Sequence, residues 1–103
     1  MKEHEIETHL KRLASQAGGR SYKWVSPGLR GVPDQIVLLP VPYEHQAILA
    51  QYIRFVECKA PGKTARGQQE LRLQELRALG FHAHVVDTIL GADVLVADMG
   101  GRL

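Results

Sequence analysis

The chain has 103 residues, of which 45% are hydrophobic and 23% are charged, and its formal net charge is +2. This length suits one domain, residues 1–103, and leaves no room for a second core. The small net charge does not by itself demand a nucleic-acid partner, and a single cysteine excludes an internal disulfide and a cysteine-rich zinc site. Charged residues follow Met1 at once and no apolar run approaches ~20 residues, so we expect a cytoplasmic protein without signal peptide or membrane partner.

The first element that the sequence predicts is an amphipathic helix over residues 2–17, ended by Gly18-Gly19. Its apolar residues recur at helical spacing and form the expected buried stripe: Ile6, Leu10, Leu13 and Ala17. Glu3 and Glu7 lie one helical turn apart, so both can flank this stripe. Acidic residues in a first turn also favour the positive N-terminus of a helix, and this plainer interpretation stays open for both.

Two short strands are expected next, over residues 21–25 and 35–39, with a turn-rich loop between them. Pro33 restricts Val32 to an extended conformation and so delivers Asp34 at the entrance of the second strand. A Pro-Asp pair that stood alone would indicate a plain turn.

A third strand is expected over residues 53–60, with apolar residues on both faces, as in a central strand covered on both sides. Because side chains alternate along a strand, Glu57 and Lys59 point to one face while Cys58 points away, into the core. Burying the acid and the lysine is costly unless they pair or bind a metal ion. An ordinary Glu/Lys ion pair at a solvated sheet end is the alternative.

Antiparallel pairing of residues 35–39 with the third strand would place the carboxylates of Asp34 and Glu57 at one end of a sheet. There they are close enough to share a cation. Two acids with Lys59 beside them suit metal-assisted phosphodiester chemistry. The connection between the two runs, residues 40–51, has room for a helical turn or two and serves either as a dimer contact or as a substrate loop.

The C-terminal half predicts a helix over residues 65–79, a strand over 81–86 and a short helix within 87–99. His82 and His84 share one face of this strand. No further ligand-type residue stands near them in a metal-binding pattern, so we expect them to be polar surface residues.

This order of elements resembles the PD-(D/E)XK nuclease core, and more narrowly the virus-type replication-repair nuclease (VRR-NUC) family in its small stand-alone form from phages and bacteria. The resemblance covers roughly residues 3–87. The matching features are Glu3 three residues before Ile6, Lys23-Trp24-Val25-Ser26-Pro27-Gly28, Gly31-Val32-Pro33-Asp34, Val56-Glu57-Cys58-Lys59-Ala60-Pro61-Gly62-Lys63, and Gln69 eleven residues before Gly80. It implies an α/β restriction-endonuclease-like fold, αβββαβ, whose central mixed sheet is flanked by helices. The chain departs from the family pattern at two places. Cys58 replaces the usual aliphatic residue between the acid and the lysine. The 40–51 connection is longer than expected for the family, and this length leaves substrate shape and dimer geometry open.

The resemblance also implies a Mg²⁺-dependent endodeoxyribonuclease, with Mn²⁺ as a possible substitute. Asp34, Glu57 and the backbone carbonyl of Cys58 would bind the metal. Lys59 would neutralise phosphate charge or position the attacking water, Gln69 would orient the water or the phosphate, and Glu3 would hold a second metal through water. The residues expected to grip flanking phosphates are Lys23, Arg30, Lys63 and Arg66.

The substrate that the resemblance implies is branched DNA. Cutting both strands of a symmetric four-way junction calls for a two-fold homodimer, so we expect an enzyme of the Holliday-junction-resolvase type. Two alternatives stay open on the same fold: a monomeric nuclease for flaps or single-strand ends, and a non-catalytic DNA-binding module. The module would be indicated by a missing ligand, whereas Asp34, Glu57 and Lys59 are all present. A structural domain whose acid pair is incidental is a third possibility.

Overall fold

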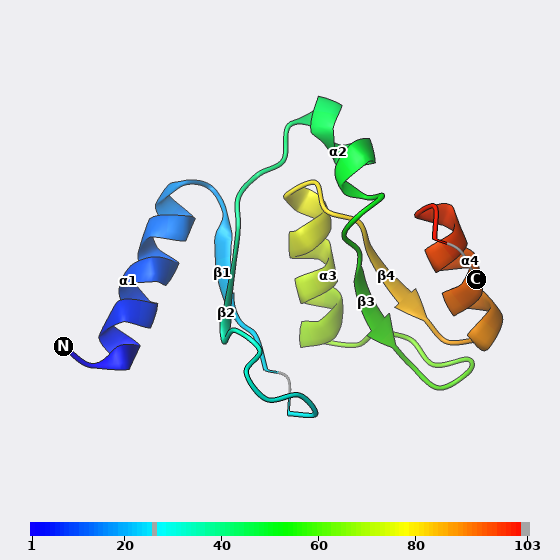
Figure 1. Cartoon of the computed structure of the whole chain (residues 1–103), viewed down its shortest axis with the longest axis horizontal. Helices are drawn as coiled ribbons and strands as arrows, with labels where there is room; N and C mark the ends of the chain where they lie inside the picture. Colours follow the sequence, from blue (N-terminus) through cyan, green and yellow to red (C-terminus); the bar gives the residue numbers. More distant parts are fainter. Residues whose placement is uncertain (26, 102–103) are drawn as a thin grey trace. The chain divides into compact units, whose positions relative to one another are not determined.

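The protein is described by a computed structural model that covers residues 1–25 and 27–101. Ser26, which belongs to the 23–28 motif, lies outside the described residues. Within the described part, helices and strands follow in the order αββαβαβα (Figure 1). The chain divides into two compact units, Met1–Pro40 and Val41–Leu103, which we describe separately. A single domain built on one shared core stays a prediction.

The first unit begins with helix α1 (Glu3–Gln16), which confirms the helix expected there. Its buried side differs from the expected stripe. Ile6 and Leu13 are 56% and 46% exposed, whereas Ala14 is buried at 4%. Glu7 is half-buried. The helix is therefore turned so that Glu7, about two turns before Ala14, lies on the side that packs against the sheet.

Strands β1 (Arg20–Lys23) and β2 (Gln35–Leu38) form an antiparallel pair against which α1 packs. The backbone N–H of Trp24 donates to the carbonyl of Asp34 at 2.8 Å and extends this ladder by one step. Gly19 lies so close to β2 that an added Cβ would fall 2.0 Å from the Leu38 carbonyl oxygen. The sheet thus holds the Asp34 backbone at the entrance of β2, which confirms the expected position of this residue in the chain.

The described part of the second unit contains two strands and three helices. They are α2 (Tyr43–Leu49), β3 (Phe55–Cys58), α3 (Gln68–Ala78), β4 (Ala83–Val86) and α4 (Ile89–Asp98). β3 and β4 are parallel, and α3 is the crossover that parallel neighbours require. Each expected element of this half is confirmed, with shorter bounds. Since β2 pairs with β1 and β3 with β4, the pairing of β2 with β3 in one mixed sheet stays a prediction.

The core of the second unit lies between α3 and the β3–β4 sheet. Leu73 and Leu76 of α3 are buried, as are Phe81 and Ala83. The rings of Phe55 and Phe81 meet edge to face with centroids 5.7 Å apart, a favourable arrangement for aromatic pairs. This packing fixes the direction in which β3 presents Glu57, two residues after Phe55 on the same face.

The side chain of Cys58 is exposed, so the prediction that it points into the core is wrong. Cys58 pairs with Val86 in the sheet, and α4 meets this face over β4, where Val86 and Leu95 line one hollow. The β3 half of the face is left open, and Val56 is 41% exposed as well. An alternating pattern shows which residues share a face of the strand. It does not show whether a helix packs on that face.

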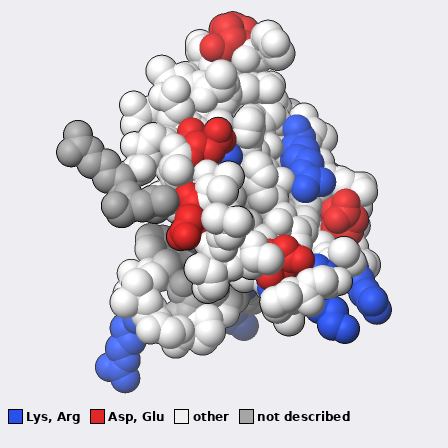
Figure 2. Space-filling view, turned by 90° about the vertical axis from the view of Figure 1, so that its right-hand side faces the viewer, with Lys and Arg blue, Asp and Glu red and all other residues white. Residues whose placement is uncertain are grey.

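Helix α4 carries apolar side chains on its outer side. Ile89, Leu90 and Val94 are 84%, 71% and 59% exposed. The face of the molecule on the α4 side shows broad uncharged areas between separate acidic and basic groups (Figure 2). Among the described residues, no helix is both long and apolar enough to span a membrane.

Arg54, just before β3, connects the end of α2, strand β4 and helix α4 through its guanidinium group. Its guanidinium donates to the Ala50 carbonyl at 2.6 Å and to Asp98 Oδ2 at 2.9 Å, and lies 3.3 Å from His84 Nε2. The side chain is only 8% exposed. Burial of His84, followed by the neighbouring positive charge of Arg54, lowers the pKa of the imidazole below its ordinary value. His82 and Arg77 act in the same direction, and Asp98 opposes them.

Unfolding stability is expected to fall as the pH is lowered through the ordinary histidine pKa of about 6.5, because the unfolded chain then takes up a proton that folded His84 resists. Above that pH the full contribution is present. Urea unfolding of wild type and of His84→Gln at a series of pH values measures this, with His4→Gln on the exposed side of α1 as the control. The His84 variant should show a shallower loss on acidification than either other protein; an equal slope in all three would contradict the assignment.

Candidate functional site

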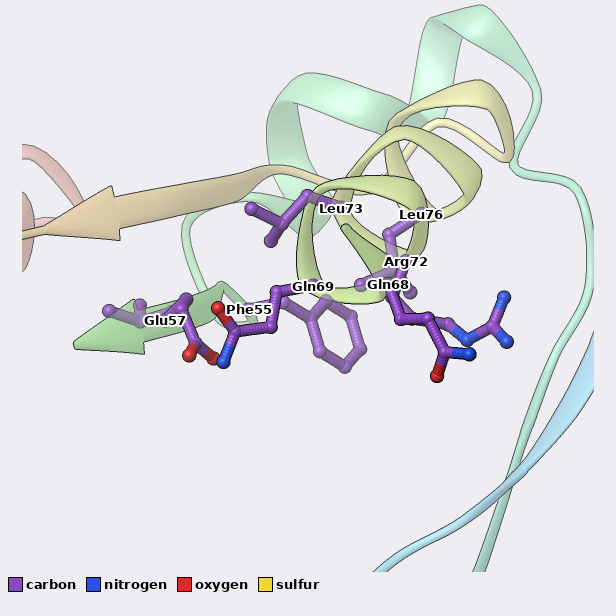
Figure 3. Close-up of a pocket in the computed structure, with 8 residues that line it drawn as sticks. Phe55, Glu57, Gln68, Gln69, Arg72, Leu73 and Leu76 are labelled. Carbon is purple, nitrogen blue, oxygen red and sulfur yellow. The ribbon is translucent and has the colours of Figure 1, made fainter. Parts of the chain in front are cut away.

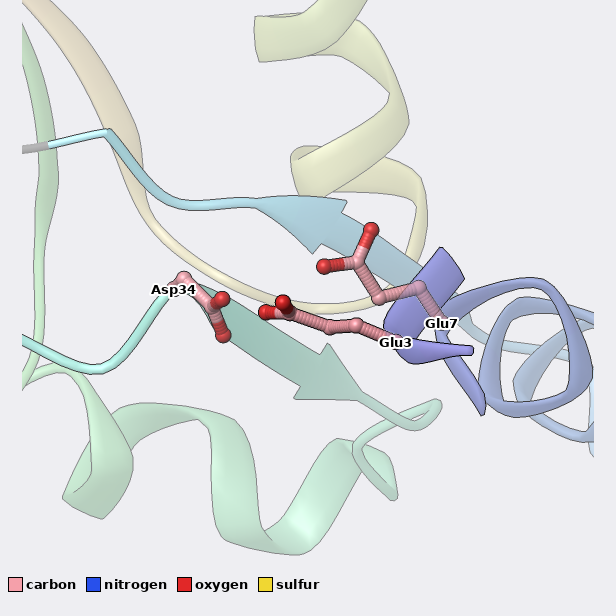
Figure 4. A group of neighbouring side chains, drawn as sticks. All are labelled: Glu3, Glu7 and Asp34. Atoms are coloured by element: carbon pink, nitrogen blue, oxygen red, sulfur yellow. The ribbon is translucent and has the colours of Figure 1, made fainter. Parts of the chain in front are cut away.

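Three carboxylates gather in the first unit. Glu3 and Glu7 project from α1, and Asp34 projects from the entrance of β2; one carboxylate oxygen of each lies within 4.8 Å of those of the other two (Figure 4). Residues four apart on a helix lie on the same face, so the first two acids are neighbours by their spacing. The backbone bond from Trp24 holds the third opposite them.

Close carboxylates repel one another unless a cation offsets their charge. Lys23 Nζ lies 3.9 Å from Glu7 Oε2, but the lysine side chain is 65% exposed, so water screens this pair. The donor atoms are all carboxylate oxygens, the hard ligands that Mg²⁺ and Mn²⁺ prefer. The cluster therefore fits a hard divalent cation in its ligand chemistry.

A second group of expected site residues lies in the other unit, around the end of β3. Lys59 Nζ lies 3.3 Å from Glu57 Oε1, with side chains 23% and 34% exposed. This confirms that the two share a face. Gln69, from the first turn of α3, lines the same pocket as Glu57 and Phe55, and its amide points toward the side on which the Glu57 carboxylate lies (Figure 3). The site half in this unit thus combines an acid, a cation and an amide.

Next to this group is a basic hollow of about 460 Å³, formed by the loop after β3 and the start of α3. Its lining residues are Lys59, Ala60, Lys63, Thr64, Arg66 and Gln69. Three of the six are cations and none is an acid, so the hollow is attractive to phosphate groups. Two of the four expected phosphate-gripping residues, Lys63 and Arg66, come together here.

The remaining expected residues lie in the first unit. Lys23 ends β1 and pairs with Glu7, and Arg30 is exposed in the loop before β2. Each unit therefore holds one half of the expected site, with Asp34 in one half and Glu57 in the other. The sharing of one cation by these two acids stays a prediction.

Glu7 is the acid of this cluster that was not among the expected catalytic or metal-binding residues, although a place beside the buried stripe and a plain role at the helix N-terminus both stayed open for it. The structure places its carboxylate with those of Glu3 and Asp34. The available signal was its spacing of four residues from Glu3, which keeps two acids on one helix face. A helix terminus alone would not have required that spacing.

A phage protein is similar to this chain over most of its length. No family model matches the chain. The protein named "Putative nuclease p44", from Acyrthosiphon pisum secondary endosymbiont phage 1, is 42% identical to this chain over 88 residues, which is 85% of each of the two chains. The match therefore spans most of both proteins and is not confined to one motif. The chain belongs to the nuclease family of this phage protein.

Proposed function

We propose that the protein is a metal-dependent, structure-specific DNA endonuclease of the VRR-NUC type, with a PD-(D/E)XK core, that hydrolyses phosphodiester bonds in branched DNA. The observation that carries this proposal is the gathering of Glu3, Glu7 and Asp34 within 4.8 Å in a chain that belongs to a nuclease family. Hard oxygen donors beside basic residues are what metal-assisted phosphate chemistry needs.

In this proposal Asp34, Glu57 and the backbone carbonyl of Cys58 hold Mg²⁺, for which Mn²⁺ can substitute. Glu3 holds a second ion through water, and Glu7 contributes charge beside it. When bound, the metal supplies polarisation of the scissile phosphate and activation of a water for in-line attack. Support comes from the chemistry of the donors, which are oxygens throughout.

The chain's own polar residues orient and neutralise the substrate. Lys59 neutralises the charge of the scissile phosphate or positions the attacking water, and its ion pair with Glu57 at 3.3 Å keeps its ammonium group at the end of β3. The Gln69 amide donates to the water or to a phosphate oxygen. Affinity without sequence information comes from contacts to flanking phosphates; the residues proposed for these contacts are Lys23, Arg30, Lys63 and Arg66.

The proposed working form is a homodimer that cuts a four-way junction of the Holliday type. One small chain supplies one active site, and a two-fold dimer supplies the two that a symmetric junction needs. The exposed apolar side chains of Ile89, Leu90 and Val94 on α4 support self-association, because apolar helix faces are normally buried.

A cleavage assay on matched DNA substrates tests the proposal, using a four-way junction, a flap, splayed arms, single strands and a linear duplex in Mg²⁺. We expect symmetric cuts in the junction and little cleavage of the duplex. Light scattering of the same preparation at micromolar concentration should give the mass of a dimer. Preferred cleavage of flaps or ends by a monomer would replace the junction assignment, and binding without cleavage would indicate a non-catalytic module.

A further inference from the structure

The basic hollow belongs to a loop, residues 59–67, that has neither helix nor strand. A turn at its tip is closed by the Lys63 N–H, which donates to the Ala60 carbonyl at 3.0 Å. Gly62 stands within this turn at φ +78, a conformation that favours glycine. The Gly62 N–H donates to Asp87 Oδ2 at 3.0 Å. The side chain of the residue that directly follows β4 is thus bonded to the middle of the turn.

The β3–β4 sheet holds Asp87, the acceptor of this hydrogen bond, in place. Asp87 directly follows β4, which pairs along its length with β3. The Lys59 N–H donates to the Val86 carbonyl at 3.0 Å and carries the ladder one step further. The carboxylate therefore connects the loop to the same two strands that position Glu57 and Lys59.

We infer that Asp87 is a positioning residue of the active site: it holds the 59–67 loop so that Lys63 and Arg66 present their charges to a DNA phosphate beside the scissile one. This inference rests on the proposed function. A hydrogen bond from a backbone N–H to a carboxylate is stronger than one to a neutral acceptor. Without the Gly62–Asp87 hydrogen bond the free loop samples more conformations. Ordering the loop on a phosphate then costs more entropy, and the affinity for DNA is lower.

The sign of the effect separates this role from simple electrostatics. Asp87 is an acid next to a surface that attracts phosphate, so removal of its charge alone should strengthen DNA binding. Removal of a clamp should weaken it. A drop in affinity on substitution is therefore evidence for positioning, since the charge effect acts in the opposite direction.

A helix role for Asp87 makes a different prediction. Asp87 precedes Thr88, the N-cap of α4, whose Oγ1 accepts from the Gly91 N–H at 2.8 Å, and an acid near a helix N-terminus stabilises the helix. Thr88→Ala removes the cap and weakens α4 without touching the loop. This variant is the matched control for effects of a destabilised α4. Asp93→Asn is the control for loss of one negative charge on the same unit.

The experiment compares the full chain with its Asp87→Ala, Thr88→Ala and Asp93→Asn variants, in junction binding, steady-state cleavage and amide hydrogen exchange at Gly62. For Asp87→Ala we expect a KM and a Kd for DNA raised about fivefold, kcat within about twofold, and faster exchange at Gly62. The two controls should match the wild type in all three.

Tighter DNA binding by Asp87→Ala would overturn the inference, as would an equal loss in Thr88→Ala or a fall in kcat at unchanged KM. A wild-type protein that binds junctions without cutting them would overturn the proposed function instead. In that case the DNA affinity of Asp87→Ala and the exchange at Gly62 still decide whether Asp87 holds the loop.

Discussion

Substitution of Asp34 by alanine is expected to reduce cleavage of junction DNA by about 10³-fold or more without weakening DNA binding. Asp34 is a proposed metal ligand, and the carboxylate is the only part of the residue that the substitution removes. Its backbone carbonyl, which accepts from Trp24, is unchanged, so the β1–β2 ladder should persist. The contacts proposed for DNA affinity are made by other residues.

Single-turnover cleavage and metal-free DNA titration measure the two quantities separately. Asp93→Ala, which removes an exposed acid from α4, is the matched control and should cut like the wild type. Circular dichroism of both variants checks that the fold is intact. An Asp34→Ala protein that is folded and still cuts at a wild-type rate would refute the metal assignment.

Removal of divalent metal is expected to lower cleavage by a comparable factor, about 10³-fold or more. The polarisation that the proposed chemistry needs cannot come from Lys59 alone, since one ammonium already pairs with Glu57. Protein dialysed against a chelator should still bind junction DNA through its basic residues, because those contacts need no metal.

The measurement is the cleavage rate of chelated protein before and after addition of Mg²⁺ or Mn²⁺. Both ions should restore activity, as expected for hard oxygen ligands. Monovalent salt at equal ionic strength is the control for a general effect of screening. Undiminished cleavage in excess chelator would show that the reaction proceeds without a divalent ion.

Much of the local structure follows from patterns in the sequence. Helical spacing predicted α1 and α3, and Pro33 correctly placed Asp34 at the entrance of β2. Alternation along the third strand correctly put Glu57 and Lys59 on one face, where they form an ion pair. These successes share a cause, because each depends on the geometry of a single element and its nearest residues.

The predictions that were wrong concern how one element packs against another. The stripe on α1 was predicted from hydrophobicity, yet Ile6 and Leu13 are exposed while Ala14 is buried, because a small side chain permits the close approach of helix and sheet. Cys58 was placed in the core by its apolar neighbours, although α4 covers the other half of that face. Neither outcome can be obtained from periodicity, which contains no information on the partner surface.

The central claim is that Asp34 and Glu57, 23 positions apart in the sequence, hold one divalent ion. Iron-directed cleavage of the protein tests it directly: Fe²⁺ replaces Mg²⁺, and peroxide with a reductant generates radicals that cut the backbone near the bound ion. The account predicts cuts close to residues 34 and 57 of the same chain, suppressed by excess Mg²⁺ and both lost in Asp34→Ala. Cuts near residues 3, 7 and 34 with none near 57 would contradict it.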